Sequence, residues 1–187
     1  MSGLSLPRLR RLVARHDVRP KVFAETGTFH GERAAMACAV FERVLTCELS
    51  PALHAEAAAT YDYLPITFVL GDSRAVIRRW AVELTEPVCW YLDAHWFTLN
   101  PNRTRAGAER DRNGGIAGQA EGLPLWDELD ALATRPYPDI IVVDDARDFG
   151  TDKPTPEWRD VSLEAIAARF PDHREAVILH DQAVVYR

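Results

Sequence analysis

Short apolar segments alternate with segments of helical periodicity along the chain. The apolar segments predict strands at residues 21–24, 44–48, 66–70, 88–92 and 140–143. The periodic segments predict helices at residues 31–41, 50–61, 73–80, 123–134 and 162–170. This alternation is typical of a parallel sheet built from β-α-β units, and two further apolar segments predict an antiparallel hairpin at its edge, at residues 176–179 and 183–186. We therefore expect an α/β fold with a doubly wound, mostly parallel sheet of about seven strands.

A polar segment at residues 97–122 interrupts this alternation. It holds five glycines and four arginines without any periodicity. Segments of this length without secondary structure are usually functional or disordered, so we interpret it as a long loop or lid. Its arginines either clamp an anionic substrate when the loop closes or form a solvated surface: Arg103, Arg105, Arg110 and Arg112.

The first 20 residues are predicted to contain a short amphipathic helix that packs on the domain. Leu6, Leu9, Leu12 and Val13 have the spacing of one apolar helix face. Residues 1–16 also carry four arginines and no acid, which is the composition of a transit peptide. We favour the packed helix because no cleavage-like stretch separates it from the first strand.

Length and composition limit the class of protein. The chain of 187 residues fits a single domain, and its net charge of −6 disfavours nucleic acid as the main partner. No apolar run approaches the ~20 residues that span a bilayer, so no membrane partner is expected. Three cysteines without C-x-x-C spacing indicate buried thiols in a reduced, cytoplasmic protein: Cys38, Cys47 and Cys89.

Each of the five predicted parallel strands ends in a carboxylate: Glu25, Glu48, Asp72, Asp93 and Asp144. One such residue is ordinary, because Asp and Glu are common in turns and helix caps. Five carboxylates, one at the end of every predicted parallel strand, favour a ligand site, because ligands of doubly wound sheets bind beyond the carboxyl ends of the strands. The candidate site therefore lies at this edge.

The turn after the first strand has a pattern that suits a nucleotide-like ligand. Gly27 and Gly31 allow the backbone to approach a ligand and open a helix with free N–H groups, although E-x-G-x-x-x-G is not the tight fingerprint of a nicotinamide dinucleotide site. Glu48, about twenty residues on, is placed to bind a ribose diol. The alternative is that Glu48 merely caps the helix that begins near Ser50.

Acidic residues follow the fourth and fifth strands. Asp93, Asp144 and Asp145 should converge, because neighbouring strands lie roughly 5 Å apart. Clustered carboxylates repel one another unless a cation or protons neutralise them, and hard oxygen ligands suit Mg²⁺ or Ca²⁺. We predict a divalent cation site on these three residues, and the oxygen ligands favour Mg²⁺. The alternative is that Asp144 or Asp145 caps a helix or pairs with Arg147.

Taken together, these segments resemble the class I S-adenosylmethionine-dependent methyltransferases, which have a Rossmann-like fold, and within them the metal-dependent catechol O-methyltransferase-like group. The similarity covers residues 20–96 and 138–147. Its motifs are E-T-G-T-F-H-G, L-T-C-E-L-S-P, L-G-D-S-R, Y-L-D-A-H-W and V-V-D-D. The resemblance implies a cofactor site formed by Glu25, Gly27, Thr28, Phe29, Gly31, Glu48, Leu49, Asp72, Ser73 and Asp93.

The chain departs from that group at three places. The group's general-base lysine has no counterpart, because Phe97 follows Trp96. The second acid of the strand-five pair is Asp145 where the group usually has Asn. The polar segment 97–122 is longer than the corresponding loop.

The resemblance implies O-methylation of a small-molecule hydroxyl, with S-adenosylmethionine as methyl donor and a magnesium ion that lowers the pKa of the acceptor oxygen. His95 and Asp93 are the catalytic candidates, with His95 as the base in place of the missing lysine. His95 alternatively borders the adenine or packs beside Trp96. Phe29 either lies against the sulfonium or belongs to the core.

Two rival functions stay open at the level of sequence. One is a metal-dependent oxygenase or hydrolase whose Fe²⁺ or Zn²⁺ is bound by residues drawn from Asp93, His95, Asp144 or Asp145, and His180. The other is a non-catalytic cofactor-binding subunit, because a fold alone does not establish activity. With no cap domain, we expect the segment 97–122, the N-terminal helix or the partner subunit of a homodimer to close the site.

Overall fold

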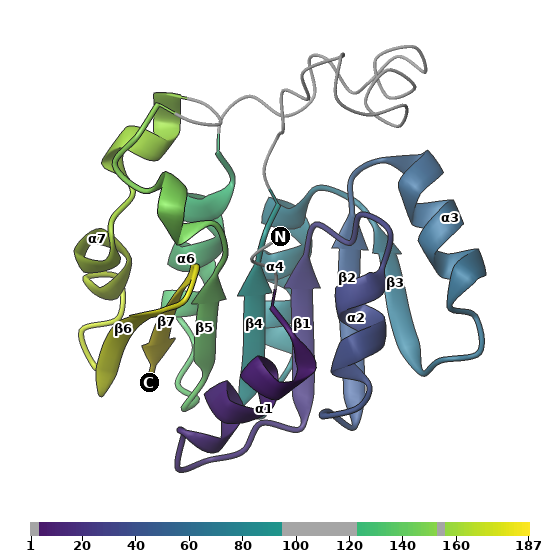
Figure 1. Cartoon of the computed structure of the whole chain (residues 1–187), viewed down its shortest axis with the longest axis horizontal. Helices are drawn as coiled ribbons and strands as arrows, with labels where there is room; N and C mark the ends of the chain where they lie inside the picture. The colour runs from purple at the N-terminus through teal and green to yellow at the C-terminus, as the bar shows by residue number, and fades with distance from the viewer. Residues whose placement is uncertain (1–3, 95–122, 153–155) are drawn as a thin grey trace.

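The structure is a computed structural model that describes residues 4–94, 123–152 and 156–187. A seven-stranded sheet runs through it in the order β3-β2-β1-β4-β5-β7-β6 (Figure 1). The first five strands are parallel, and β7 is antiparallel to both of its neighbours. The strands are β1 (Val22–Thr26), β2 (Arg43–Glu48), β3 (Ile66–Leu70), β4 (Val88–Leu92), β5 (Ile140–Val143), β6 (Glu175–Leu179) and β7 (Gln182–Tyr186).

Helices cover both faces of the sheet, as a doubly wound fold requires (Figure 1). One face packs against α1 (Leu6–Ala14) and α2 (Glu32–Ala37). The other packs against α4 (Ser73–Glu83), α6 (Leu125–Ala133) and α7 (Leu163–Ala167). In the part of the chain that the structure describes, the other elements are α3 (Pro51–Thr60) and two short 3-10 helices, Ala146–Asp148 and Pro156–Asp160. The predicted fold class is confirmed.

Alternation along each strand divides the core into two layers. Phe23, Tyr91 and Val142 face α1 and α2, while their neighbours Ala24 and Trp90 face α4 and α6. Both β4 and β5 are buried along their whole length, as nearly continuous apolar runs predict for central strands. The same alternation continues past the strand ends and decides which face each polar residue of the site meets.

Several element boundaries differ from the predicted ones. β1 extends to Thr26, so Glu25 belongs to the strand and not to the turn after it. The helix predicted at 31–41 ends at Ala37, and the helix predicted at 73–80 continues to Glu83. The first change matters most, because a strand residue points straight onto one face of the sheet, whereas a turn residue does not.

The N-terminal helix packs on the sheet as predicted. Leu9, Leu12 and Val13 are buried, and the Tyr186 hydroxyl donates to the Leu12 carbonyl at 3.2 Å. The ring nitrogens of buried His16 lie 2.7 and 2.9 Å from backbone carbonyl oxygens after the helix and at Arg187. These contacts hold α1 rigidly against β7. Among the described helices, none is long and apolar enough to cross a bilayer.

Candidate functional site

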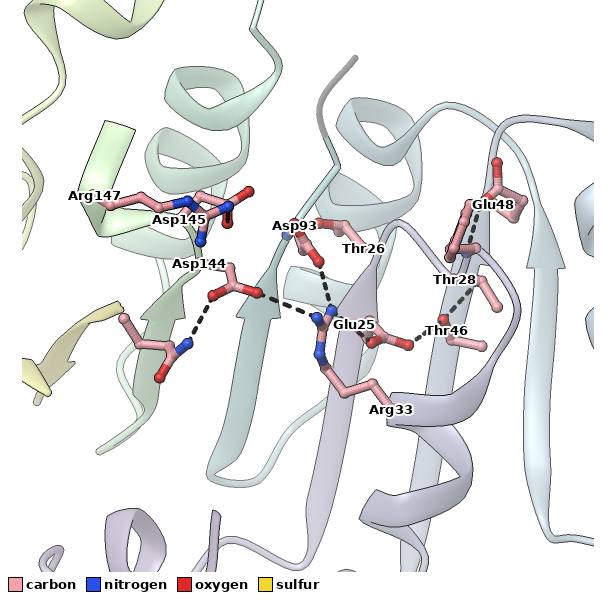
Figure 2. Close-up of polar contacts among 12 residues, drawn as sticks. Glu25, Thr26, Thr28, Arg33, Thr46, Glu48, Asp93, Asp144, Asp145 and Arg147 are labelled. Atoms are coloured by element: carbon pink, nitrogen blue, oxygen red, sulfur yellow. Dashed lines mark hydrogen bonds and ion pairs between the residues drawn. The ribbon is translucent and has the colours of Figure 1, made fainter. Parts of the chain in front are cut away.

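The Arg33 guanidinium lies at the centre of the candidate site (Figure 2). Nη1 donates to Asp93 Oδ2 at 2.6 Å and to Glu25 Oε1 at 3.3 Å, and Nη2 donates to Asp144 Oδ2 at 3.2 Å. Its Cζ lies 4.2 Å from the centre of the Tyr91 ring, a cation–π contact. One cation from α2 therefore joins the ends of three parallel strands.

The pleat of the sheet explains why these three carboxylates meet. Strands β1, β4 and β5 are paired in register, so that Thr26 lies beside Leu92 and Leu92 beside Val143. Side chains along a strand point to the same face every second residue. Glu25 and the first residues beyond β4 and β5, which are Asp93 and Asp144, therefore lie on the face covered by α2. The acids therefore converge on whatever α2 presents, which is Arg33.

Glu25 is completely buried. Thr46 on the neighbouring strand donates its hydroxyl to Glu25 Oε2 at 2.8 Å. Burial raises the pKa of Glu25 to about 7, and the Arg33 charge and the Thr46 hydrogen bond only partly oppose this shift. Glu25 is thus poised to hold or release a proton near neutral pH, according to the charge of the groups around it.

The turn after β1 is pressed against the end of β4. A side chain at Gly27, where φ is +78°, would place its Cβ 2.6 Å from the Asp93 carbonyl oxygen, so only glycine fits. The amides of Gly27 and Thr28 both donate to the Cys47 carbonyl, and the Thr28 and Thr46 hydroxyls are 2.6 Å apart. The turn is fixed on both sides, between β2 and β4.

Glu48 connects the end of β2 to this turn. Its Oε2 accepts from the Phe29 amide and its Oε1 from the Ser50 amide, each at 2.9 Å. The cap of α3 is supplied by the Ser50 hydroxyl, which accepts from the Leu53 amide, and not by Glu48. Phe29 itself is at positive φ and half exposed, so it does not belong to the core. Leu49, a predicted cofactor residue that follows β2, is half-buried.

The other predicted cofactor residues lie at the start of helices on the same edge. Gly31 has φ +82° and precedes α2. Asp72 caps α4 by accepting from the Arg74 amide at 2.8 Å, and Ser73, the first residue of α4, is buried. Asp72 thus has the ordinary structural role of a helix cap.

The carboxylates after β5 lie close to an acid of the β6–β7 turn. Among the described residues, the one group of three whose ligand atoms lie within 4.8 Å of one another is Asp144, Asp145 and Asp181. Asp93 is instead held by Arg33, whose guanidinium also binds Asp144. The prediction that Asp93, Asp144 and Asp145 share a divalent cation stays a prediction, and in the structure the Arg33 guanidinium lies between Asp93 and Asp144.

Asp145 and Asp181 also have a cationic partner, Arg147, as the alternative interpretation of the sequence had it. The Arg147 amide donates to Asp181 Oδ1 at 3.0 Å. On the other side, Gln182 Nε2 donates to Asp144 Oδ1 at 2.8 Å. These contacts tie the end of β5 to the β6–β7 turn.

His95 and the arginines of segment 97–122 lie outside the described residues, so their predicted roles stay predictions. The same holds for the rival iron site, which needs His95 beside His180. His180 is described and lies in the β6–β7 turn at positive φ, as expected of a hairpin turn residue.

Sequence reasoning missed three residues of the site: Arg33, Glu128 and Gln182. Arg33 is the one cation among the alanines of α2, and the excess of carboxylates at the strand ends was a signal that a buried cation was needed. Glu128 is a buried acid on the apolar face of α6, close to Ser73 and Thr26. No feature of the sequence pointed to Gln182, because only the pairing of the hairpin with β5 brings this residue to the site.

The buried Glu128 gives a testable dependence of stability on pH. Burial raises its pKa from 4.5 to about 7, against the hydrogen bonds of Ser73 and Thr26. Because the folded state binds this proton more tightly, stability is highest below pH 4.5 and falls as the pH rises through about 7. We expect Glu128→Gln to remove up to about 3 kcal/mol of this decline, measured by urea unfolding at pH 5 and pH 8.

The exposed Glu83 on α4 offers the control, and Glu83→Gln should leave the decline unchanged. Glu25 contributes a decline of the same sign, so some dependence persists in both variants. An identical decline in Glu128→Gln and in the unmodified chain would contradict the assignment.

Comparison with known proteins shows which fold this chain shares with solved structures. No family model and no curated protein matches the sequence. Among solved structures, the chain is similar to a putative methyltransferase from Streptococcus mutans in complex with SAH, with a TM-score of 0.61 and 10% identity over 100% of this chain and 98% of that chain. It is also similar to an rRNA methylase from Streptococcus thermophilus (TM-score 0.53, 10% identity, 100% and 96% covered). A third similar structure is the N-methyltransferase NodS from Bradyrhizobium japonicum WM9 (TM-score 0.52, 13% identity, 97% and 91% covered).

These likenesses define the class of fold. The chain has the Rossmann-like fold of the S-adenosylmethionine-dependent methyltransferases, with the strand order and C-terminal hairpin described above. At such low identity the comparisons show the fold alone. One of the three proteins is an rRNA methylase and another is an N-methyltransferase, so the activity and acceptor of this chain must be argued from its own residues.

Proposed function

We propose that this chain is an S-adenosylmethionine-dependent methyltransferase that acts on a small-molecule hydroxyl. The observation that carries the proposal is the turn after β1, which Gly27 presses against Asp93 on one side and which Glu48 holds on the other. This turn lies at the carboxyl edge of a sheet whose fold is shared with a protein solved in complex with SAH. Ligands of doubly wound sheets bind at that edge.

The charges around the turn suit a cationic ligand. Glu25, Asp93 and Asp144 surround a single guanidinium, that of Arg33, so the cluster has more acids than cations. A sulfonium and an ammonium group would compensate the remaining negative charge. Binding of such a cation would lower the pKa of Glu25 from about 7 and release its proton.

Glu48 is proposed to hold the ribose. A carboxylate offers about four lone-pair sites, and each Glu48 oxygen accepts only one amide in the described contacts. The Phe29 and Ser50 amides orient the carboxylate and leave acceptor positions for a diol. The fixed geometry lowers the entropic cost of binding.

S-adenosylmethionine, when bound, supplies an electrophilic methyl group on a positively charged sulfur. An acceptor oxygen in line with that methyl group would form a carbon–oxygen bond as the carbon–sulfur bond broke, with the electron pair of the broken bond left on a neutral thioether sulfur. The acceptor proton would pass to a carboxylate or to water. We propose that Asp93, which is fixed by Arg33 and by its own amide on Thr26 Oγ1, orients the acceptor hydroxyl.

The predicted magnesium ion has no part in this proposal. A cation bound by Asp93 and Asp144 together would have to displace the Arg33 guanidinium from both. Asp145 and Asp181 are paired with Arg147. The residues therefore do not fit the predicted ion, and we infer that Arg33 supplies the positive charge expected of a metal.

Calorimetry with S-adenosylhomocysteine tests the proposal. We expect saturable binding that is unchanged by Mg²⁺, and we expect Glu48→Gln to weaken it at least about tenfold, because a charge-assisted hydrogen bond contributes about 1.5–3 kcal/mol. Glu42→Gln, an exposed acid just before β2, is the matched control and should bind normally. An absence of binding in the unmodified chain would exclude the methyltransferase proposal, whereas binding that requires Mg²⁺ would restore the metal.

A further inference from the structure

A cavity of about 180 Å³ lies between α1 and the β6–β7 hairpin. Three arginines of the N-terminal segment line one side of it: Arg8, Arg11 and Arg15. The hairpin forms the other side with Leu179, His180 and Gln182. From this cavity we propose that the methyl acceptor carries a carboxylate or phosphate group and that this anionic group binds among the α1 arginines. The inference rests on the proposed function and specifies its substrate class.

One end of the cavity, at Gln182, lies at the same edge of the sheet as the candidate site. The antiparallel pairing of β5 and β7 puts Ala183 beside Val143, the last residue of β5. The preceding residue, Gln182, lines the cavity and donates to Asp144 at 2.8 Å. Asp144 in turn binds Arg33. A single side chain therefore separates the cavity from the cluster where the methyl group would be transferred.

The charge of the cavity selects an anion. The three arginines are three and four residues apart and so share one face of the helix. Arg15 is paired with Glu175 at the start of β6, but no acidic residue is among the described residues that line the cavity. Guanidinium groups bind carboxylates and phosphates through paired N–H donors. The proposal thereby gives a role to the positive charge of residues 1–16, which stands out in a chain of net charge −6.

The cavity favours a small anion over a polyanion. Its volume admits a carboxylate or phosphate with a few attached atoms, but it is smaller than the sites of drug-sized ligands, which are roughly 300–1,000 Å³. Residues 17–187 carry ten more acids than bases, which opposes the approach of a nucleic acid backbone. The helix that presents the arginines is anchored by buried Leu9, Leu12 and Val13, so the anion meets a preformed site.

The proposal is tested by titrating the full chain, saturated with S-adenosylhomocysteine, with inorganic phosphate and with acetate. Binding is followed by the NMR shifts of the backbone amides and of the arginine side chains. We expect saturable shifts at Arg11 and at the 179–182 turn. Arg11→Gln should weaken anion binding about five- to tenfold, because it removes a charge-assisted contact. Arg10→Gln removes the same charge from the exposed side of α1 and should not change it. Tighter binding of phosphate or of acetate would say which anion the acceptor carries.

Three results would overturn the inference. Normal binding of S-adenosylhomocysteine without saturable anion shifts would remove the acceptor subsite and leave the methyltransferase proposal intact. Anion binding in a chain that does not bind S-adenosylhomocysteine would remove the methyltransferase proposal and the acceptor role with it. Binding of a single-stranded RNA oligonucleotide that Arg10→Gln and Arg11→Gln weaken equally would indicate a polyanion surface instead.

Discussion

Arg33→Met is expected to lower the free energy of unfolding by about 3 kcal/mol and to abolish the binding of S-adenosylhomocysteine. The variant leaves Glu25, Asp93 and Asp144 together without the guanidinium that separates them. Glu25 suffers most, because it is completely buried and Arg33 is the charge that lowers its pKa. Urea unfolding measures the stability, and the Tm should fall by roughly 6–12 °C.

Two variants separate the charge of Arg33 from its shape. Arg33→Lys keeps the positive charge but lacks the planar fork that reaches three carboxylates, so we expect partial recovery of stability and weak cofactor binding. Arg43→Met, on the exposed start of β2, should change stability by no more than about 0.5 kcal/mol. Full cofactor affinity in folded Arg33→Met would show that the cluster is structural only.

Arg135→Met is expected to destabilise the chain by about 3–5 kcal/mol without weakening cofactor binding in the molecules that remain folded. Arg135 and Asp139 form an ion pair in which both side chains are fully buried. The guanidinium also donates to the carbonyls of Ala81, Leu84 and Glu86. Removing it leaves a buried carboxylate and three carbonyls without their donor.

The location of this pair explains why cofactor binding should survive. Asp139 Oδ1 accepts a hydrogen bond from the amide of Val88, the first residue of β4. Asp139 also directly precedes Ile140, the first residue of β5. The pair therefore lies at the amino ends of the strands, opposite the candidate site. Arg78→Met is the control, since Arg78 pairs with Asp127 on the surface and such pairs contribute little. A loss of S-adenosylhomocysteine affinity in folded Arg135→Met would contradict this separation.

The order of elements could be predicted because it depends on local hydrophobic periodicity. The strands β3, β4 and β5 have the bounds that the sequence indicates, since each is a short, mostly apolar segment between helical ones. Once the strands are parallel and in register, their carboxyl ends meet at one edge. The convergence of Glu25, Asp93 and Asp144 follows from the sequence to this extent, and so does the position of Glu48 beside the first turn.

The amino-acid sequence alone predicts the order of the strands along the chain, the glycine turn and the acids at the edge. The group that neutralises those acids is known only from the folded structure. Arg33 is 60 residues from Asp93 and 111 from Asp144 in sequence, and its contacts depend on the direction of α2 and on side-chain torsions. The contact of Gln182 with Asp144 depends on the pairing of β7 with β5. Periodicity carries no information about such distant contacts, because it reports which face a residue occupies and not which partner it meets there.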